Sequence, residues 1–321
     1  MLIAFAVIGA IVIGFGSWVF FAGNDGEPVK IDRRRRHQAL ESLAELGAVV
    51  PRKDSLARGF ELPVGVSLGA QWQGGNDGLK YLPDVQAIDE LVLDAPQLDD
   101  TGLRHLHGLR HVEALEFRAT SVTDEGLRQL ESLRSLELLK LDGRSITDRG
   151  LRSLRQLNPV WLTIENGSQV SDAGLARLQD MTNLICLRLT DAKLSGNGLA
   201  SLEKLQNLRT LALAGCPVDD AALPHVSAFR KLRRLDLSRT NVRGPGLVHL
   251  RRLKRLDELT LNETAVQDED LQYLAGLDTL TVLSLEGTRV TRAGAESLGT
   301  LKNLKTVLLG RGQVVRLNHN P

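Results

Sequence analysis

Residues 103–126, with the sequence LRHLHGLRHVEALEFRATSVTDEG, decide the fold of this chain, because their pattern recurs without a gap. The next 24 residues, at 127–150, read LRQLESLRSLELLKLDGRSITDRG, and further copies follow every 24 residues as far as 294. One more copy precedes the first at 79–102. When each copy is numbered from its first residue, position 1 is Leu in all nine copies and position 24 is Gly in seven. A fixed period of this length predicts a solenoid of stacked coils.

Within each copy, the spacing of apolar residues predicts a strand, a turn and a short helix. Apolar side chains recur at positions 1, 4, 7, 10, 13, 15 and 20. The spacing of two is the period of a strand, and the spacing of three suits a short helix or 3₁₀ turn. The Thr-Asp-x-Gly sequence, as at 123–126, stands where a Thr, Ser or Asp caps the following helix. One such coil cannot bury its own apolar face, so stability must come from neighbouring coils.

The pattern L-x-x-L-x-x-L-x-x-L-x-x-L-x-L, followed by a small residue and V-T-D-x-G, resembles a leucine-rich repeat over residues 79–294, with partial copies over about 62–321. Position 18 lacks the Asn of the commonest version, so the resemblance is closest to the cysteine-containing, ribonuclease-inhibitor-like variants, and a continuous amide ladder is not expected. The resemblance implies an α/β fold: a right-handed, horseshoe-shaped solenoid of about ten coils with parallel strands on the concave face. It also implies protein binding as the usual function.

The N-terminus predicts a membrane anchor. Residues 2–22 are 21 residues without a charge, long enough to cross a bilayer as one helix. A cleaved signal peptide is the alternative, but no Lys or Arg precedes the apolar run. Because Lys30 and the arginines at 33–36 follow the segment, the charge bias predicts a single-pass protein of bacterial type with its repeats in the cytoplasm.

Composition and pattern divide the chain into four parts. We expect a transmembrane helix at 2–22 and a charged juxtamembrane linker at 23–36. Residues 37–78 read as a capping helix, HQALESLAELG, and an atypical first coil that contains Trp72. The leucine-rich repeat domain then occupies residues 79–321.

One copy departs from the period by a single residue. In the copy that begins at Leu151, the strand pair is Leu162 and Ile164, one residue early. A slip of one residue turns every side chain of a strand to the other face unless the flanking loops absorb it. With that correction, Trp161 is expected to face outward on the concave side.

No motif for catalysis, metal binding or cofactor binding is visible. The sequence contains no nucleophile elbow, phosphate loop, zinc spacing or dinucleotide fingerprint. His105, His107 and His111 are interpreted as surface residues, because no Cys or carboxylate completes a ligand set in the sequence. The recurrent Asp at position 22 is interpreted as a helix cap. We therefore expect no enzyme, no metal and no cofactor.

Charge is unevenly distributed along the chain. The net charge is +1, yet residues 61–102 carry −7 and residues 223–256 carry +9. This basic stretch is either a solvated rim or a docking patch for an acidic partner; nucleic acid is less favoured because no aromatic residues are interleaved. The predicted basic rim comprises Arg230, Lys231, Arg233, Arg234, Arg251, Arg252, Lys254 and Arg255.

The concave face supplies a second candidate. Side chains at positions 12, 14 and 16 point away from the core, so core packing does not restrict them. Coils three to five combine apolar and charged residues at these positions. Such a mixture suits an interface, although Trp161 could equally cover the slip in its own coil. The predicted concave centre comprises Leu138, Lys140, Trp161, Glu165, Cys186 and Arg188.

The favoured function is a membrane-tethered, non-catalytic scaffold that binds an unidentified protein through the concave centre, the basic rim or both. One alternative is a self-assembling envelope protein in which acidic and basic ends pair between molecules, which makes a homo-oligomer possible. An enzyme is the last alternative.

Overall fold

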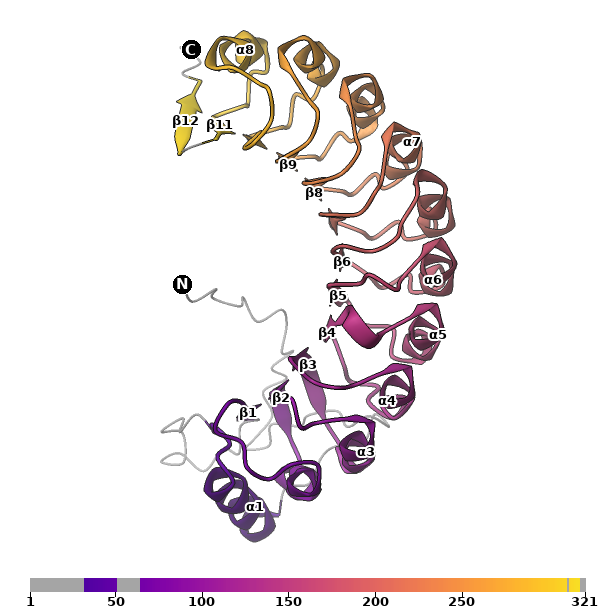
Figure 1. The fold of residues 1–321 in the computed structure, drawn as a ribbon, viewed down its shortest axis with the longest axis vertical. Helices are drawn as coiled ribbons and strands as arrows, with labels where there is room; N and C mark the ends of the chain where they lie inside the picture. Colours follow the sequence, from indigo (N-terminus) through magenta and orange to yellow (C-terminus); the bar gives the residue numbers. More distant parts are fainter. Residues whose placement is uncertain (1–31, 51–63, 311, 318–321) are drawn as a thin grey trace, which may run out of the picture.

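The computed structural model describes residues 32–50, 64–310 and 312–317. They form a curved solenoid in which strands line the inner edge of the arc and short helices lie along the outer edge (Figure 1). One sheet runs through the whole arc in the chain order of its strands, from β1 to β12. Neighbouring strands pair parallel from β1 to β11, and β12 pairs antiparallel with β11.

The longest strands are β2 and β3, and the shortest are β7 to β10. The strands in chain order are β1 Val64–Leu68, β2 Ile88–Asp94, β3 Val112–Arg118, β4 Leu138–Asp142, β5 Trp161–Glu165, β6 Cys186–Leu189, β7 Thr210–Ala212, β8 Arg234–Asp236, β9 Glu258–Thr260, β10 Val282–Ser284, β11 Thr306–Leu309 and β12 Gln313–Arg316.

α-Helical and 3₁₀ turns form the outer edge, except for η4, which directly follows β4 and packs beside β5. The α-helices are α1 Arg33–Glu45, α2 Leu82–Val85, α3 Asp100–Leu103, α4 Asp124–Arg128, α5 Asp148–Leu151, α6 Asp172–Leu175, α7 Leu223–Val226 and α8 Arg292–Ser297. The 3₁₀ helices are η2 Asp77–Tyr81, η3 Arg104–Gly108, η4 Gly143–Ser145, η5 Ser153–Gln156, η6 Ala176–Leu178, η7 Gly196–Leu202, η8 Asp220–Ala222, η9 Gly244–Arg252, η10 Asp268–Leu274 and η11 Leu298–Thr300.

A single apolar core runs between the strands and the outer helices. In the copy at 127–150, the leucines at positions 1, 4, 7 and 13 are fully buried, and those at positions 10 and 15 are nearly so. The same positions are buried in coil after coil, so the core is continuous along the arc. The predicted stack of parallel strands over a leucine core is confirmed.

The predicted one-residue slip is also confirmed. Trp161 pairs with Leu138 on one side and Cys186 on the other, while Leu162 stays fully buried. Asn158 and Asn166, before and after β5, adopt positive φ angles of 43° and 55°. Asn tolerates this conformation better than most residues. The two loops therefore absorb the one-residue shift, and the side chains of β5 keep their inward and outward faces.

The coils are tied together by a carboxylate ladder, which corrects the interpretation of the recurrent Asp as a helix cap. The cap is the preceding residue: Thr147, for example, accepts from the Arg149 backbone N–H. Asp124, one coil earlier, accepts from Thr147 instead, with Oδ1 2.8 Å from the backbone N and Oδ2 2.6 Å from Oγ1. The same bonds join Asp100 to Thr123, Asp148 to Ser171, Asp172 to Ser195 and Asp268 to Thr291, and Asp220 accepts from the backbone N–H of Arg243.

Both ends of the solenoid differ from its middle coils. The N-terminal helix begins at Arg33 rather than at the predicted His37, because Asp32 accepts from the backbone N–H groups of Arg34 and Arg35. At the other end, the antiparallel return of β12 onto β11 was not visible in the repeat pattern.

Among the residues that the structure describes, no helix is long and apolar enough to cross a membrane. The predicted span at 2–22, with most of the linker at 23–36, lies outside them.

Candidate functional site

A basic pocket opens at the amino-terminal ends of the strands in the C-terminal half of the arc. Its volume is about 630 Å³. Because corresponding residues of successive coils lie side by side along the sheet, bases 22 to 24 residues apart in sequence meet at one wall. The pocket is lined by Arg209, Lys231, Arg233, Lys254, Arg255, Asp257, Thr279 and Thr281.

The pocket carries a surplus of positive charge. Five bases face one acid, and Asp257 already pairs with Arg233 at 2.7 Å. Lys231 is held by Asn207, whose Oδ1 accepts from Nζ at 2.8 Å. The hydroxyl groups of Thr279 and Thr281 donate to the backbone carbonyls of Leu256 and Asp257. The remaining bases are exposed, and this arrangement suits a ligand with several negative charges.

The structure divides the predicted basic rim into two groups. Lys231, Arg233, Lys254 and Arg255 line the pocket. Arg230 instead donates to the carbonyl of Arg252, and Arg251 donates to the carbonyls of Gln272 and Tyr273. Arg234 pairs with Glu258 at 3.3 Å on the concave face, and the side chain of Arg252 is exposed outside the pocket lining. Sequence reasoning missed Arg209, because it precedes the stretch of high charge density. Reading position 11 down successive copies would have found it, since Arg233 occupies the same position one coil later.

The apolar part of the predicted concave centre is assembled as expected. Leu138, Trp161 and Cys186 are register partners on three adjacent strands, and all three are partly exposed. Arg188 is exposed beside them and pairs in register with Thr163. The three side chains therefore form a small apolar surface on the inner face of the arc.

Cys186 is not a reactive nucleophile in this setting. Burial raises the pKa of its thiol, and the nearby Arg188 opposes this only in part. Burial likewise raises the pKa of Cys216 to about 11. Both thiols therefore stay protonated at neutral pH, while thiol chemistry requires the thiolate.

The charged part of the concave centre is internally paired, which the sequence did not indicate. Lys140 lies between two carboxylates, 2.9 Å from Glu116 and 3.1 Å from Glu165. Glu116 also accepts from Arg118 at 2.7 Å. A partner that binds Lys140 or Glu165 must therefore compete with bonds within the scaffold.

Replacing Glu116 by Gln should produce a pH-dependent loss of stability. Burial alone would raise the pKa of Glu116, but hydrogen bonds from Arg118 and Lys140 outweigh it and hold the pKa below its ordinary value. Its contribution is then fully present above the unfolded pKa of about 4.3 and is lost as the pH falls through the lower folded value. We expect Glu116→Gln to cost about 1–3 kcal/mol at pH 7.

The measurement is urea unfolding of the parent chain and the Glu116→Gln variant at pH 7, 5 and 3. The difference in unfolding free energy should persist from pH 7 to 5 and shrink towards pH 3. A difference that stays constant over the whole range would contradict the assignment.

The histidines are only partly where the sequence placed them. His107 is exposed and contacts Gln129, whereas His111 is 5% exposed, so its interpretation as a surface residue is wrong. Two carboxylates lie beside its imidazole: Glu113 stands two residues later in the same coil, and coil stacking brings Asp89 from the preceding coil.

A comparison with protein families supports the architecture. A family model described as a leucine-rich repeat region matches residues 103–316. No curated protein matches the chain in sequence.

Among solved structures, an internalin (inlF) from Listeria monocytogenes is similar with 20% identity and a TM-score of 0.48, over 80% of this chain and 82% of that one. The Arabidopsis receptor kinase HAESA, in a complex with the peptide hormone IDA and the co-receptor SERK1, is similar with 16% identity and a TM-score of 0.55. That match covers 87% of this chain but about half, 49%, of the receptor chain.

Proposed function

Because the chain belongs to the leucine-rich repeat proteins, we propose that it is a non-catalytic scaffold that binds an acidic segment of a partner protein in the basic pocket. The observation that carries the proposal is the pocket itself, in which five bases from three adjacent coils surround one paired acid. Complementary charge steers such a partner and sets its register. The concave centre, one to three coils away, offers Leu138, Trp161 and Cys186 to the flanking residues of the same partner.

A protein partner fits the pocket better than a nucleic acid. Single-stranded nucleic acids are generally held by aromatic stacking as well as by basic residues, and no Phe, Tyr or Trp lines the pocket. The receptor kinase HAESA, which shares the fold, was solved with a peptide and a co-receptor bound.

Reversing two charges in the pocket should weaken binding of an acidic peptide by about 30-fold. The variant is Lys254→Glu with Arg255→Glu, and the estimate takes about 1 kcal/mol for each exposed charge. The probe is a fluorescent peptide of alternating Glu and Gly, read by anisotropy. A peptide with Gln in place of Glu should bind neither protein, and binding to the parent chain should weaken with salt.

The matched control is Arg149→Glu with Arg177→Glu, which makes the same change in net charge at exposed positions on the outer helices. Equal weakening in both double variants would show a bulk charge effect and overturn the pocket as the site. Trp161→Ala, tested with peptides extended by apolar residues, reports whether the segment continues onto the concave centre.

Self-assembly is the second candidate, and one observation favours it. Asp89, Glu113 and Glu137 occupy position 11 in the N-terminal half of the arc, the position that Arg209 and Arg233 occupy in the other half. Two copies in opposite directions could pair these edges. Light scattering at low and high salt separates the candidates, because assemblies held by these charges dissociate as salt rises, whereas a scaffold for another protein remains a monomer throughout.

The scaffold is further proposed to be tethered to a membrane through residues 2–22, with its repeats in the cytoplasm. This rests on the uncharged length of the segment and on the bases that follow it. Fusions of alkaline phosphatase and green fluorescent protein to the C-terminus test it: we expect fluorescence without phosphatase activity. Phosphatase activity without fluorescence would reverse the topology.

A further inference from the structure

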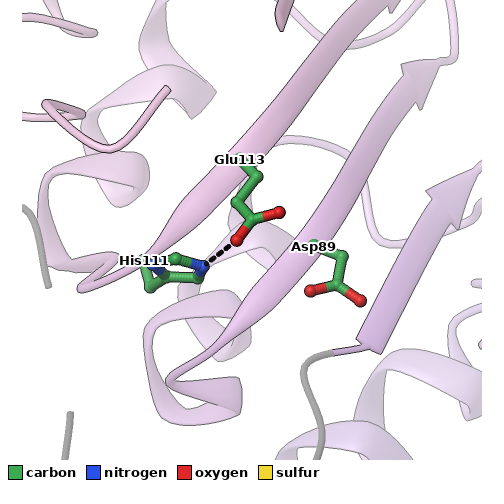
Figure 2. A group of neighbouring side chains, drawn as sticks. All are labelled: Asp89, His111 and Glu113. Atoms are coloured by element: carbon green, nitrogen blue, oxygen red, sulfur yellow. Dashed lines mark hydrogen bonds and ion pairs between the residues drawn. The ribbon is translucent and has the colours of Figure 1, made fainter. Parts of the chain in front are cut away.

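Three potential metal ligands from two adjacent coils converge at the N-terminal end of the sheet. Asp89 belongs to β2 and Glu113 to β3, while His111 stands just before β3 (Figure 2). One ligand atom of each side chain lies within 4.8 Å of the other two. The backbone N–H of Ile88 donates to the carbonyl of His111 at 3.1 Å, so the two strands hold the group together.

The environment of the imidazole favours a ligand role. His111 is 5% exposed, so its ring has little freedom to turn, and its Nε2 lies 3.1 Å from Glu113 Oε1. The side chain of Glu113 is 47% exposed, which leaves one side of the group open to solvent. A cation could therefore reach the group without any opening of the core.

The two carboxylates favour a cation at this place. Asp89 and Glu113 each supply an oxygen beside the imidazole. A divalent cation bound between them would be attracted by both carboxylates.

We propose that Asp89, His111 and Glu113 form a binding site for a divalent cation of the zinc type. One imidazole nitrogen and two carboxylates are a ligand set that Zn²⁺ accepts with bonds of about 2.0–2.2 Å, whereas Ca²⁺ requires about six to eight oxygens. Such bonds place the ligand atoms roughly 3–3.6 Å apart, and small rotations of the two carboxylates bring the group to that spacing. Three protein ligands leave one position of a tetrahedral ion for water or for a group from a partner.

The site would also join two coils. Its ligands are separated by only 24 residues in sequence but belong to different strands, so a bound ion would add a link between coils at the acidic end of the stack. Because binding to the folded chain alone shifts the unfolding equilibrium, a bound ion should raise the melting temperature.

The test uses the full chain, purified without a histidine tag, and Co²⁺ as the spectroscopic probe. We expect one equivalent of Co²⁺ to give visible absorption bands, which stoichiometric Zn²⁺ removes and millimolar Mg²⁺ or Ca²⁺ does not. Asp89→Asn and Glu113→Gln should each weaken binding by at least about tenfold, since even outer-shell changes at metal sites cost that much. The control, Glu90→Gln, alters the neighbouring carboxylate on β2 and should leave affinity unchanged.

Both ligand variants preserve side-chain size, and circular dichroism checks that they fold. Zn²⁺ should raise the melting temperature of the parent chain and of Glu90→Gln, but not that of either ligand variant. Absence of stoichiometric binding to the parent chain would overturn the site, and so would unchanged affinity in both ligand variants.

Discussion

Replacement of Gly150 by Ala is expected to lower the free energy of unfolding by about 2–3 kcal/mol, although it adds only one methyl group. A Cβ at this position would lie 2.3 Å from Oδ1 of Asp124. That carboxylate cannot retreat freely, because it holds the backbone N–H and the hydroxyl of Thr147. The methyl group would therefore break a rung of the ladder or push the coils apart.

The sequence itself pairs the residue at position 22 of one copy with the residue at position 24 of the next copy. Wherever position 22 is Asp in the copies at 79–270, position 24 of the next copy is Gly. The two copies with Gly at position 22, at Gly196 and Gly244, are followed by Ala222 and Asp270 at position 24. A larger residue at position 24 is thus accompanied by Gly, which has no side chain, at position 22 of the preceding copy. This complementarity predicts strong coupling between the two positions.

A double-mutant cycle measures that coupling. Asp124→Gly alone should cost about 2–3 kcal/mol, since it removes two hydrogen bonds to a charged group. The double variant, Asp124→Gly with Gly150→Ala, should cost at least about 1 kcal/mol less than the sum of the single variants. Urea unfolding supplies the three values.

Gly299→Ala is the matched control, because a Cβ there would meet nothing within 4 Å. It should change stability by less than about 0.5 kcal/mol. If the Asp124 and Gly150 effects simply add, the steric account of the Thr-Asp-x-Gly sequence is wrong.

Replacement of Trp72 by Ala should destabilise the N-terminal end by about 3–5 kcal/mol, the range for large aromatic residues in cores. Trp72 is 3% exposed, and its indole Nε1–H donates to the carbonyl of Gly75 at 3.0 Å. Its ring covers Gly74 and Gly78, where any Cβ would collide with it. The ring therefore closes the core between α1 and the first coil.

The loss of stability should be confined to the N-terminal end of the solenoid. Stability in a solenoid depends on neighbouring coils, so fraying should begin at β1 and β2 and spare the far end. Hydrogen exchange should show lost protection in β1 and β2 and retained protection in β9. Trp161→Ala is the control, because that ring is partly exposed on the concave face and should cost much less. Uniform loss of protection along the chain would show that the ring has no special role in the cap.

The period of the sequence was sufficient to predict the coil. Apolar spacing identified the strands and the core, since a side chain at a given position meets the same environment in every copy. Even the slip at Trp161 was predictable, because strand side chains alternate and only one register keeps Leu162 and Ile164 buried. Family resemblance added the curvature and the general expectation of protein binding.

Contacts between coils were decided only by the tertiary structure. The partner of Asp124 is 23 residues away, the bases of the pocket come from adjacent coils, and Asp89 reaches His111 across the sheet. Linear charge density therefore missed Arg209, and linear ligand spacing missed the approach of Asp89 to His111 and Glu113. The physical reason is that parallel strands stack about 4.8 Å apart, so a residue's nearest neighbours outside its own coil lie about one full period away in sequence.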